Sequence, residues 1–185
     1  MAVSAYAATD FAGTAGQKIE RKLLLTYVNC SAFGENYSST PTWQLVGKGV
    51  EDSSIEHNPS VTTTTDITGV TETSVDELQS SQSFEPMTVR VGSKLHFKLT
   101  DILERKAKSE FALFEVLIVR AYITETDSSA TVYHAEKQTG CTVYPTSEGG
   151  SAYVDMPIQI NFSNNSTLGT VASLSTPSFT PLSGT

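Results

Sequence analysis

The chain has 185 residues, of which 38% are hydrophobic and only 17% are charged, and its formal net charge is −8. This length fits one domain, and the scarcity of charge excludes a coiled coil and a highly charged disordered tail. The negative charge also argues against a basic surface that binds nucleic acid. Because threonine and serine are abundant, the composition favours short strands over helices.

The first predicted elements follow a small, polar N-terminal arm over residues 1–20. A short apolar run over 22–30 predicts a first strand, and residues 43–50 predict a second strand that two glycines interrupt. The segment 31–41 between them consists of turn-forming residues and predicts a loop.

A long β-hairpin is predicted over residues 60–91, with a turn at Gly69 and a further strand over 84–91. Its polar strands have little apolar surface to bury within one chain, so we expect the hairpin to lie against a neighbouring subunit. The residues that we expect at this contact are Thr62, Thr63, Thr64, Thr65, Thr71, Thr73 and Phe84.

The one convincing helix is predicted over 94–107, with Ser93 as its N-cap. Its apolar residues recur at helical spacing and predict a buried face. The residues of this face are Leu95, Leu99, Ile102 and Leu103.

The remaining elements are again strands. Residues 111–123 are apolar on both alternating sets and predict a strand that is covered on both faces. Short strands over 132–136 and 141–144 and an alternating strand over 152–162 follow. Residues 173–185 predict a C-terminal arm. The sequence therefore predicts a β-sandwich or small barrel of antiparallel strands with one flanking helix, over residues 21–172.

The sequence contains no pattern for catalysis or metal binding. The three histidines fall in three different elements, and the adjacent Glu51 and Asp52 would point to opposite faces of a strand. We therefore expect a protein that is not an enzyme and that holds no metal or cofactor. Cys30 and Cys141 favour two free buried thiols over one disulfide. Without a secretion signal or a membrane-spanning run, we expect synthesis in a cytoplasm and no membrane insertion.

Charge is distributed unevenly along the chain. Residues 51–91 hold eight acidic residues and one basic residue, whereas residues 92–108 hold five basic and two acidic residues. An acidic segment with strand-forming residues either builds one functional surface or forms a solvated face that keeps the subunit soluble.

Three stretches of the chain, taken together and in this order, indicate a family resemblance more specifically than any one of them alone. The first is 43–69 (WQLVGKGVEDSSIEHNPSVTTTTDITG), the second is 92–107 leading into 111–121, and the third is Gly149-Gly150 followed by VDMPIQINFSNNSTLGT. Together they cover about residues 20 to 172. In this order, they resemble the major tail tube proteins of long-tailed bacteriophages that infect Gram-positive bacteria.

This resemblance implies a subunit that forms hexameric rings, which stack into a hollow tube for DNA in the virion tail after assembly in the host cytoplasm. It implies tape-measure, tail terminator and distal tail proteins as partners, and DNA that passes without specific binding. Because a DNA channel should not hold phosphates, we expect part of the acidic set to face the lumen. The candidates are Glu51, Asp52, Glu56, Asp66, Glu72, Asp76 and Glu77.

Two alternatives stay open. One is a tube subunit of a contractile tail or of a tail-like bacteriocin. The other is a carbohydrate-binding β-sandwich, in which Tyr37, Trp43 and Tyr144 would be platforms for sugar rings. A sugar-binding module usually gathers aromatic residues on one face, whereas the aromatic residues here are scattered over separate predicted elements.

Overall fold

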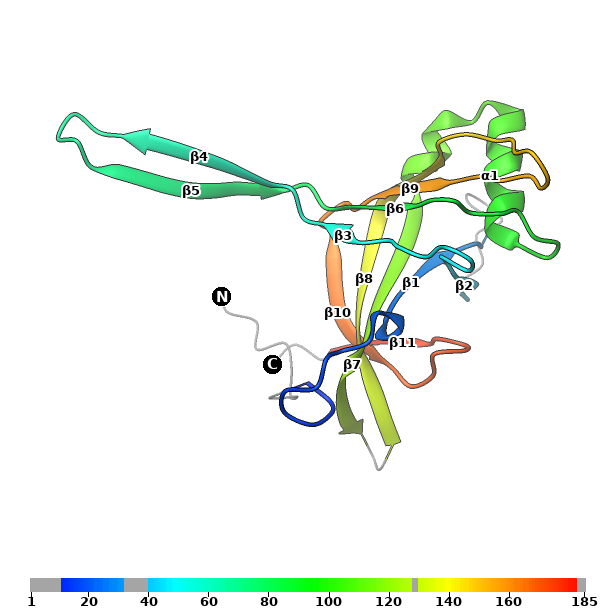
Figure 1. Cartoon of the computed structure of the whole chain (residues 1–185), viewed down its shortest axis with the longest axis horizontal. Coiled ribbons are helices and arrows are strands. Elements are labelled where there is room, and N and C mark those ends of the chain that lie inside the picture. The colour runs from blue at the N-terminus through cyan, green and yellow to red at the C-terminus, as the bar shows by residue number, and fades with distance from the viewer. Residues whose placement is uncertain (1–10, 32–39, 128–129, 183–185) are drawn as a thin grey trace.

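The structure is a computed structural model that describes residues 11–31, 40–127 and 130–182 (Figure 1). The strands and helices, in chain order, are η1 (Arg21–Leu23), β1 (Leu24–Asn29), β2 (Trp43–Leu45), β3 (Ile55–Glu56), β4 (Pro59–Thr65), β5 (Thr71–Leu78), β6 (Ser81–Phe84), α1 (Lys94–Arg105), η3 (Lys108–Ala112), β7 (Phe114–Asp127), β8 (Ala130–Pro145), β9 (Ile158–Asn161), β10 (Ser166–Val171) and β11 (Phe179–Pro181).

The body consists of antiparallel sheets that share the long strand β8. On one side the strand order is β2-β1-β7-β8-β10-β11, and on the other it is β8-β9-β6-β3. All these pairs are antiparallel, and α1 is the one α-helix of the described residues. The predicted fold class, a mainly β structure with one flanking helix, is therefore confirmed.

A bulge at Gly140 lets β8 take part in both sheets. Phe114 pairs with Cys141 while Glu115 pairs with Thr139, so Gly140 is the extra residue, and its φ is +76°. Glycine adopts this backbone conformation at low cost. Beyond the bulge, β8 pairs with β9 instead of β7. The prediction of two short strands, 132–136 and 141–144, is wrong because pairing with β7 and β10 keeps the intervening polar residues in one strand.

The main core lies between the sheets and beneath α1. It joins residues of β1, β7, β9 and α1, among them Val28, Val116, Ile158 and Leu99, all with no exposed surface. A second, smaller cluster lies on the other face of β1 and β7. Segments after β10 cover this cluster, and the Tyr27 hydroxyl donates to the Leu174 carbonyl at 2.6 Å.

The predicted C-terminal arm therefore begins as part of the body. Strand β11 pairs with β10, and Phe179 packs against the second cluster. Residues 179–181 belong to the sheet because their backbone pairs with β10 and the Phe179 side chain packs against apolar residues. The serine- and proline-rich sequence around them does not indicate this. The last three residues, 183–185, lie outside the described residues.

The N-terminus of α1 is attached to β2 by side chains. The Ser93 hydroxyl accepts from the His96 backbone N–H at 3.4 Å, as expected of an N-cap. Gln44 of β2 donates to that hydroxyl at 2.9 Å and accepts from the Leu95 N–H at 3.0 Å. Lys106, in the left-handed conformation, ends the helix. These bonds orient the helix over the core.

The helix face predicted to be buried packs largely as its spacing indicates. Leu95, Leu99 and Ile102 have no exposed surface, and Leu103 is half-buried. Phe97, on the first turn, is 79% exposed and points away from this core. The exposed side of α1 is therefore not entirely polar.

The long hairpin is shorter than predicted. It consists of β4 and β5 and ends at Leu78, whereas β6 pairs with β9 and β3 in the body. Phe84 is only 2% exposed and belongs to the main core, so its assignment to the hairpin is wrong. The non-local pairing of β6 with β9 decides this boundary, and the polar residues before Phe84 do not reveal it.

Two other predicted strands are also shorter. Strand β2 ends at Leu45, and both Gly47 and Gly49 then adopt positive φ values. Strand β9 covers only Ile158–Asn161, and Val154, within the predicted strand 152–162, is 52% exposed. Between β6 and α1, the segment predicted as a strand forms only an isolated bridge from Thr88.

Both cysteines are free thiols, which is the alternative that the sequence favours. Burial raises the pKa of Cys30 to about 12, although attraction to Lys98 and Lys94 opposes this rise. Burial also raises the pKa of Cys141. Since the thiolate is the reactive form, both thiols are poor nucleophiles at neutral pH. No helix in the described part of the chain is long and apolar enough to cross a membrane.

Candidate assembly surfaces

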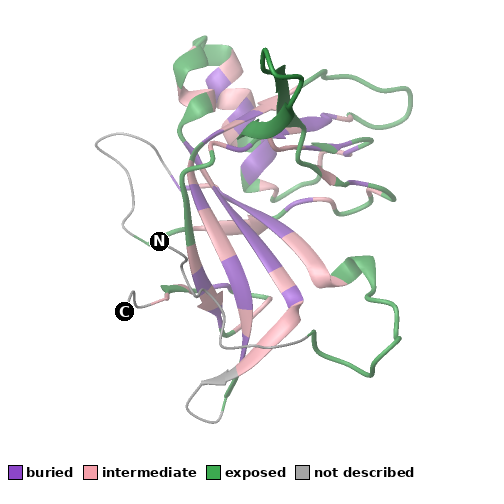
Figure 2. Cartoon of the chain, turned by 90° about the vertical axis from the view of Figure 1, so that its left-hand side faces the viewer, coloured by how far each residue is buried: buried purple, intermediate pink, exposed green. Residues whose placement is uncertain are grey.

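The β4–β5 hairpin projects from the body and is in contact with solvent on all sides. Every residue of both strands is exposed (Figures 1 and 2). A two-stranded hairpin is marginally stable on its own in water and usually needs a surface to pack against. Among the described residues, those of the body contact only the base of this hairpin, and the rest of both strands has nothing to pack against. The hairpin is therefore the first candidate for contact with another molecule.

One face of the hairpin carries no charge, and we call it the uncharged face. Cross-strand partners share a face, and the hydroxyls of Thr63 and Thr73 lie 3.3 Å apart, as those of Thr65 and Thr71 lie 3.1 Å apart. These contacts pair the threonine hydroxyls across the two strands. The uncharged face comprises Pro59, Val61, Thr63, Thr65, Thr71, Thr73, Val75 and Leu78.

The opposite face carries three carboxylates and is called the acidic face. A register shift between Ser60 and Val61 places Asp76 in a bulge. Its carboxylate accepts hydrogen bonds from the hydroxyls of Thr62 and Ser74, which keeps it on this side. The acidic face comprises Ser60, Thr62, Thr64, Glu72, Ser74, Asp76 and Glu77. No lysine, arginine or histidine occurs between Pro59 and Leu78.

The hairpin tip is organised by Asp66. Its carboxylate accepts from the Thr68 N–H at 2.8 Å, the Thr68 hydroxyl at 2.6 Å and the Val70 N–H at 2.9 Å. The bond from the Thr68 hydroxyl, followed by the bond from Val70, lowers the pKa of Asp66. Gly69 completes the turn with φ +84°. The Asp66 carboxylate therefore stabilises the turn at the hairpin tip. Its position toward a lumen is a separate prediction.

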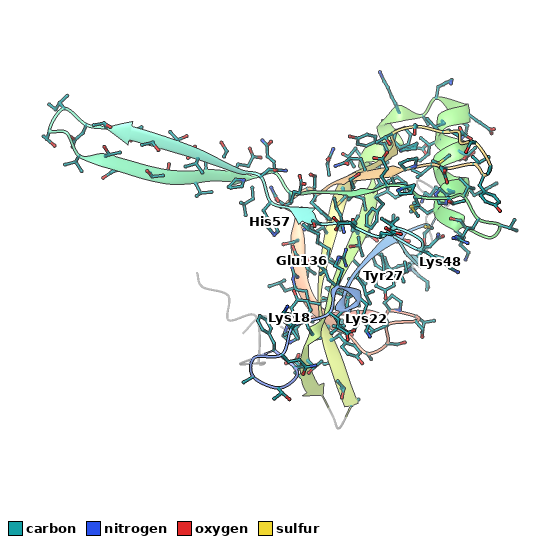
Figure 3. All side chains as sticks on the ribbon, in the orientation of Figure 1. Lys18, Lys22, Tyr27, Lys48, His57 and Glu136 are labelled. Carbon is teal, nitrogen blue, oxygen red and sulfur yellow. The ribbon has the colours of Figure 1, made fainter. Side chains whose placement is uncertain are left out.

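The base of the hairpin is fixed to the body by side chains. Asn164, which follows β9, donates to the Leu78 carbonyl at 2.5 Å, and Asn58 donates to the Gln79 carbonyl at 3.2 Å. His57 Nδ1 lies 3.1 Å from the Ser80 hydroxyl, and Figure 3 shows this histidine at the junction of hairpin and body. These bonds limit the directions in which the hairpin can point.

A groove of about 480 Å³ lies beneath this base, between the hairpin and the β7–β8 sheet. Arg120 and Glu136 form an ion pair across its floor with an N–O distance of 2.9 Å. Gln138 is only 6% exposed and donates to Glu136 at 2.9 Å. Farther along β7 and β8, His134 Nε2 lies 3.6 Å from the Glu125 carboxylate. The groove thus combines an internal ion pair with apolar side chains such as Ile118 and Phe162.

The structure divides the acidic residues predicted to face a lumen into two groups. Glu72, Asp76 and Glu77 lie on the acidic face of the hairpin, and Asp66 lies at its tip. The other three, Glu51, Asp52 and Glu56, are exposed on the body. One protomer therefore does not bring all seven together, and their position toward a lumen stays a prediction.

The lumen-facing candidates predicted from the sequence do not include Glu85, an acidic residue of the body. Glu85 lines a shallow depression together with Asp52, Glu56 and Gln159. The pairing of β3 with β6 brings these residues together across a long stretch of chain. The one signal for Glu85 in the sequence is that it belongs to the acidic segment 51–91.

The described residues contain no group of three or more histidine, cysteine or carboxylate side chains placed to hold a metal ion. Of the predicted sugar platforms, Trp43 is half-buried against the second core cluster, and Tyr144 is half-buried in β8. Tyr37 lies outside the described residues. Trp43 and Tyr144 belong to strands that do not pair with each other.

No family model matches the sequence, and no curated protein matches it. Among solved structures, the chain is similar to one from the cryo-EM structure of the anti-feeding prophage cap, described as the AFP tube terminating cap. The two chains are 13% identical with a TM-score of 0.42, and the match covers 92% of this chain and 99% of the other. At this TM-score, the likeness carries no argument about function.

Proposed function

We propose that this chain is a structural subunit of a bacteriophage tail tube, which assembles with copies of itself into stacked hexameric rings around a DNA channel. Its role is mechanical, without a reaction or a cofactor. Its further partners are the tape-measure, tail terminator and distal tail proteins, and its place is the virion tail. The proposal starts from the sequence resemblance in residues 20–172.

The observation that carries the proposal is the projecting hairpin. Two strands of seven and eight residues stand in solvent with every residue exposed, and one of their faces has no charge. A monomeric protein gains nothing in stability from such an element, whereas a subunit that repeats in a ring or tube has a neighbour for it. The short strands β2, β3 and β11 lie at the edges of the sheets, so one side of each has no neighbouring strand to pair with its backbone groups.

The carbohydrate-binding alternative receives no support from the aromatic residues. Trp43 contributes to a core cluster, and it does not share a paired strand with Tyr144. Sugar recognition by stacking needs exposed rings on one face. The exposed rings of the described residues are Phe11, Phe97 and Tyr153, and none of the predicted sugar platforms is among them.

Electron microscopy of the purified full chain tests the proposal. We expect rings or tubes with a central channel once the protein concentration is raised, together with a large sedimenting species in analytical ultracentrifugation. A chain that stays monomeric at every concentration and salt condition, also when mixed with a preformed tail tip, would contradict a tube subunit. Binding to immobilised glycans by such a monomer would favour the alternative.

A further inference from the structure

A lysine, a glutamate and an asparagine form one polar cluster on three adjacent strands of the body. Asn29 ends β1, Glu115 lies in β7 and Lys137 lies in β8, and strand pairing places β7 between the other two (Figure 1). Asn29 Nδ2 donates to Glu115 Oε2 at 2.8 Å, and Lys137 Nζ lies 3.4 Å from Glu115 Oε1. One carboxylate therefore holds the amide of Asn29 on one oxygen and the amine of Lys137 on the other.

This cluster lies on the sheet face that carries the second core cluster. Leu117, the cross-strand partner of Lys137, belongs to that core cluster, and the Lys137 ammonium lies 5.9 Å from the centre of the Phe179 ring. Asn29 is only 3% exposed, and the side chains of Glu115 and Lys137 are 17% and 27% exposed. The three polar groups are thus largely shielded from water, which strengthens the electrostatic interactions among them.

The carbonyl end of the Asn29 amide is bound by two backbone donors. Its Oδ1 accepts from the Ser31 N–H at 3.0 Å and from the Thr42 N–H at 3.1 Å. Thr42 shares its N–H with the Ser31 hydroxyl, at 3.0 Å. Because N–H donors face Oδ1 and a carboxylate faces Nδ2, the orientation of the amide is fixed. Two such donors stabilise negative charge on this oxygen, as an oxyanion hole does.

We propose that Lys137 and Asn29 join in an isopeptide bond, with Glu115 as the proton carrier. The Lys137 ammonium first gives a proton to the Glu115 carboxylate, and the neutral amine then attacks Asn29 Cγ. Negative charge develops on Oδ1, where the two backbone N–H groups bind it. Glu115 gives its proton to Nδ2, the Cγ–Nδ2 bond breaks and ammonia leaves. The carboxylate then takes up the remaining extra proton of Nζ.

The reaction balances without a further reactant. A lysine ammonium and a primary amide give a secondary amide and, once Glu115 releases its proton to the departing ammonia, an ammonium ion; no group is oxidised or reduced. The bond forms once in each chain, without turnover. It joins β1 to β8 across β7 and encloses more than half of the chain in a loop, which restricts the unfolded state. The inference goes beyond the proposed function and does not depend on assembly.

Mass spectrometry of the purified full chain tests the inference. We expect an intact mass lower by one ammonia than the sequence predicts. After trypsin digestion, residues 23–48 and 121–185 should remain together as one branched peptide, because trypsin does not cleave after an acylated lysine. A folded chain that keeps its full mass and yields the separate peptides 121–137 and 138–185, also after long incubation at neutral pH, would overturn the inference.

Three variants identify the groups that react. Lys137→Arg keeps a cation beside Glu115 but removes the amine, and Glu115→Gln removes the proton carrier, so both should retain the ammonia and lose the branched peptide. Lys48→Arg, at an exposed position, is the matched control and should behave as the unmodified chain. Ammonia loss that persists in Lys137→Arg would assign it to another amide and overturn the inference. The branched peptide of the unmodified chain decides the bond even where a variant fails to fold, and either result leaves the proposed function intact.

Discussion

At the residue scale, Asp66 shows how one side chain organises the hairpin tip. Its carboxylate receives three hydrogen bonds from Thr68 and Val70, which together close the turn. We expect Asp66→Ala to weaken the cross-strand nuclear Overhauser effects between Thr65 and Thr71, while the body spectrum stays unchanged. Glu72→Ala, which removes an exposed carboxylate of the same hairpin, is the matched control. Equal spectra for the two variants would contradict the role of Asp66.

The same carboxylate makes the tip sensitive to acid. Because hydrogen bonds to its charged form lower the pKa of Asp66, its contribution to the turn is fully present above the ordinary aspartate value of 3.8. The contribution is lost as pH falls through the lower pKa of the folded state. The turn therefore persists at neutral pH.

The buried histidines predict a separate pH dependence of the whole body. Burial lowers the pKa of His96 and of His134 below 6.5, and for His134 the attraction to Glu125 opposes this while Arg120 adds to it. As pH falls below 6.5, the unfolded chain takes up protons that the folded chain refuses, so the free energy of unfolding decreases. The decrease ends once pH passes the pKa of the folded state.

Urea unfolding at about pH 7.5 and about pH 5.5, on either side of the ordinary histidine pKa, measures this effect. We expect the unmodified chain to lose stability between the two values, and His134→Gln to lose less because one of the two groups is gone. His57→Gln, at an exposed position, is the control and should behave as the unmodified chain. An identical loss in all three proteins would assign the pH dependence to other groups.

At the scale of elements, the bulge at Gly140 joins the two sheets of the body. Its φ of +76° disfavours any residue with a Cβ, although no neighbouring atom lies within 4 Å of the position a Cβ would take. We expect Gly140→Ala to lower the free energy of unfolding by about 1 kcal/mol through backbone strain alone. Chemical denaturation followed by tryptophan fluorescence measures it, since Trp43 packs in the second core cluster.

Gly69 provides a matched control for that substitution. Its φ is +84° and its Cβ position is equally open, but it lies at the tip of the exposed hairpin. Gly69→Ala should therefore leave global unfolding unchanged, because the hairpin contributes no buried surface to the core. If both variants lose the same stability, the hairpin and the body unfold as one unit, contrary to this expectation.

At the scale of the whole molecule, we expect the hairpin to serve assembly and the body to fold without it. Pro59 and Leu78 are cross-strand partners at the hairpin base, so residues 60–77 can be replaced by a two-glycine turn. We expect this variant to unfold cooperatively, within about 0.5 kcal/mol of the parent chain, because no core residue is removed. Electron microscopy should show no tubes, and normal tubes would contradict a contact role for the hairpin.

The charge of the proposed channel is the second property at this scale. The body residues Glu51 and Glu56 are exposed, so Glu51→Lys with Glu56→Lys changes charge with little effect on folding. In a phage that carries this subunit, we expect normal tubes with slower genome delivery, because lysines in a channel hold phosphates. Glu51→Gln with Glu56→Gln removes the same two carboxylates without adding a cation. This pair is the matched control and should deliver DNA at nearly the normal rate.

The outcomes of that experiment separate three roles. Slow delivery with normal tubes supports a lumen position for these two carboxylates. Unchanged delivery refutes it, and failed assembly moves them to an interface between subunits. Delivery is measured as the rate of DNA release triggered by the purified receptor or by host envelopes.

The sequence by itself determined the local properties of this protein. Helical spacing located α1 and its buried leucines, alternation and threonine content predicted an antiparallel β fold, and the position of Ser93 predicted the helix cap. The threonine-rich stretch and Gly69 also predicted the hairpin, although not its end at Leu78. These features depend on residues that are close together in the sequence, so local patterns are enough to predict them.

Only the tertiary structure decided the boundaries and the shared surfaces. Phe84 enters the core because β6 pairs with β9, far along the chain, and residues 179–181 join the sheet because β10 offers a free edge. The polar middle of β8 stays extended because strands flank it on both sides. Long-range backbone pairing creates each of these features, and no local pattern encodes it.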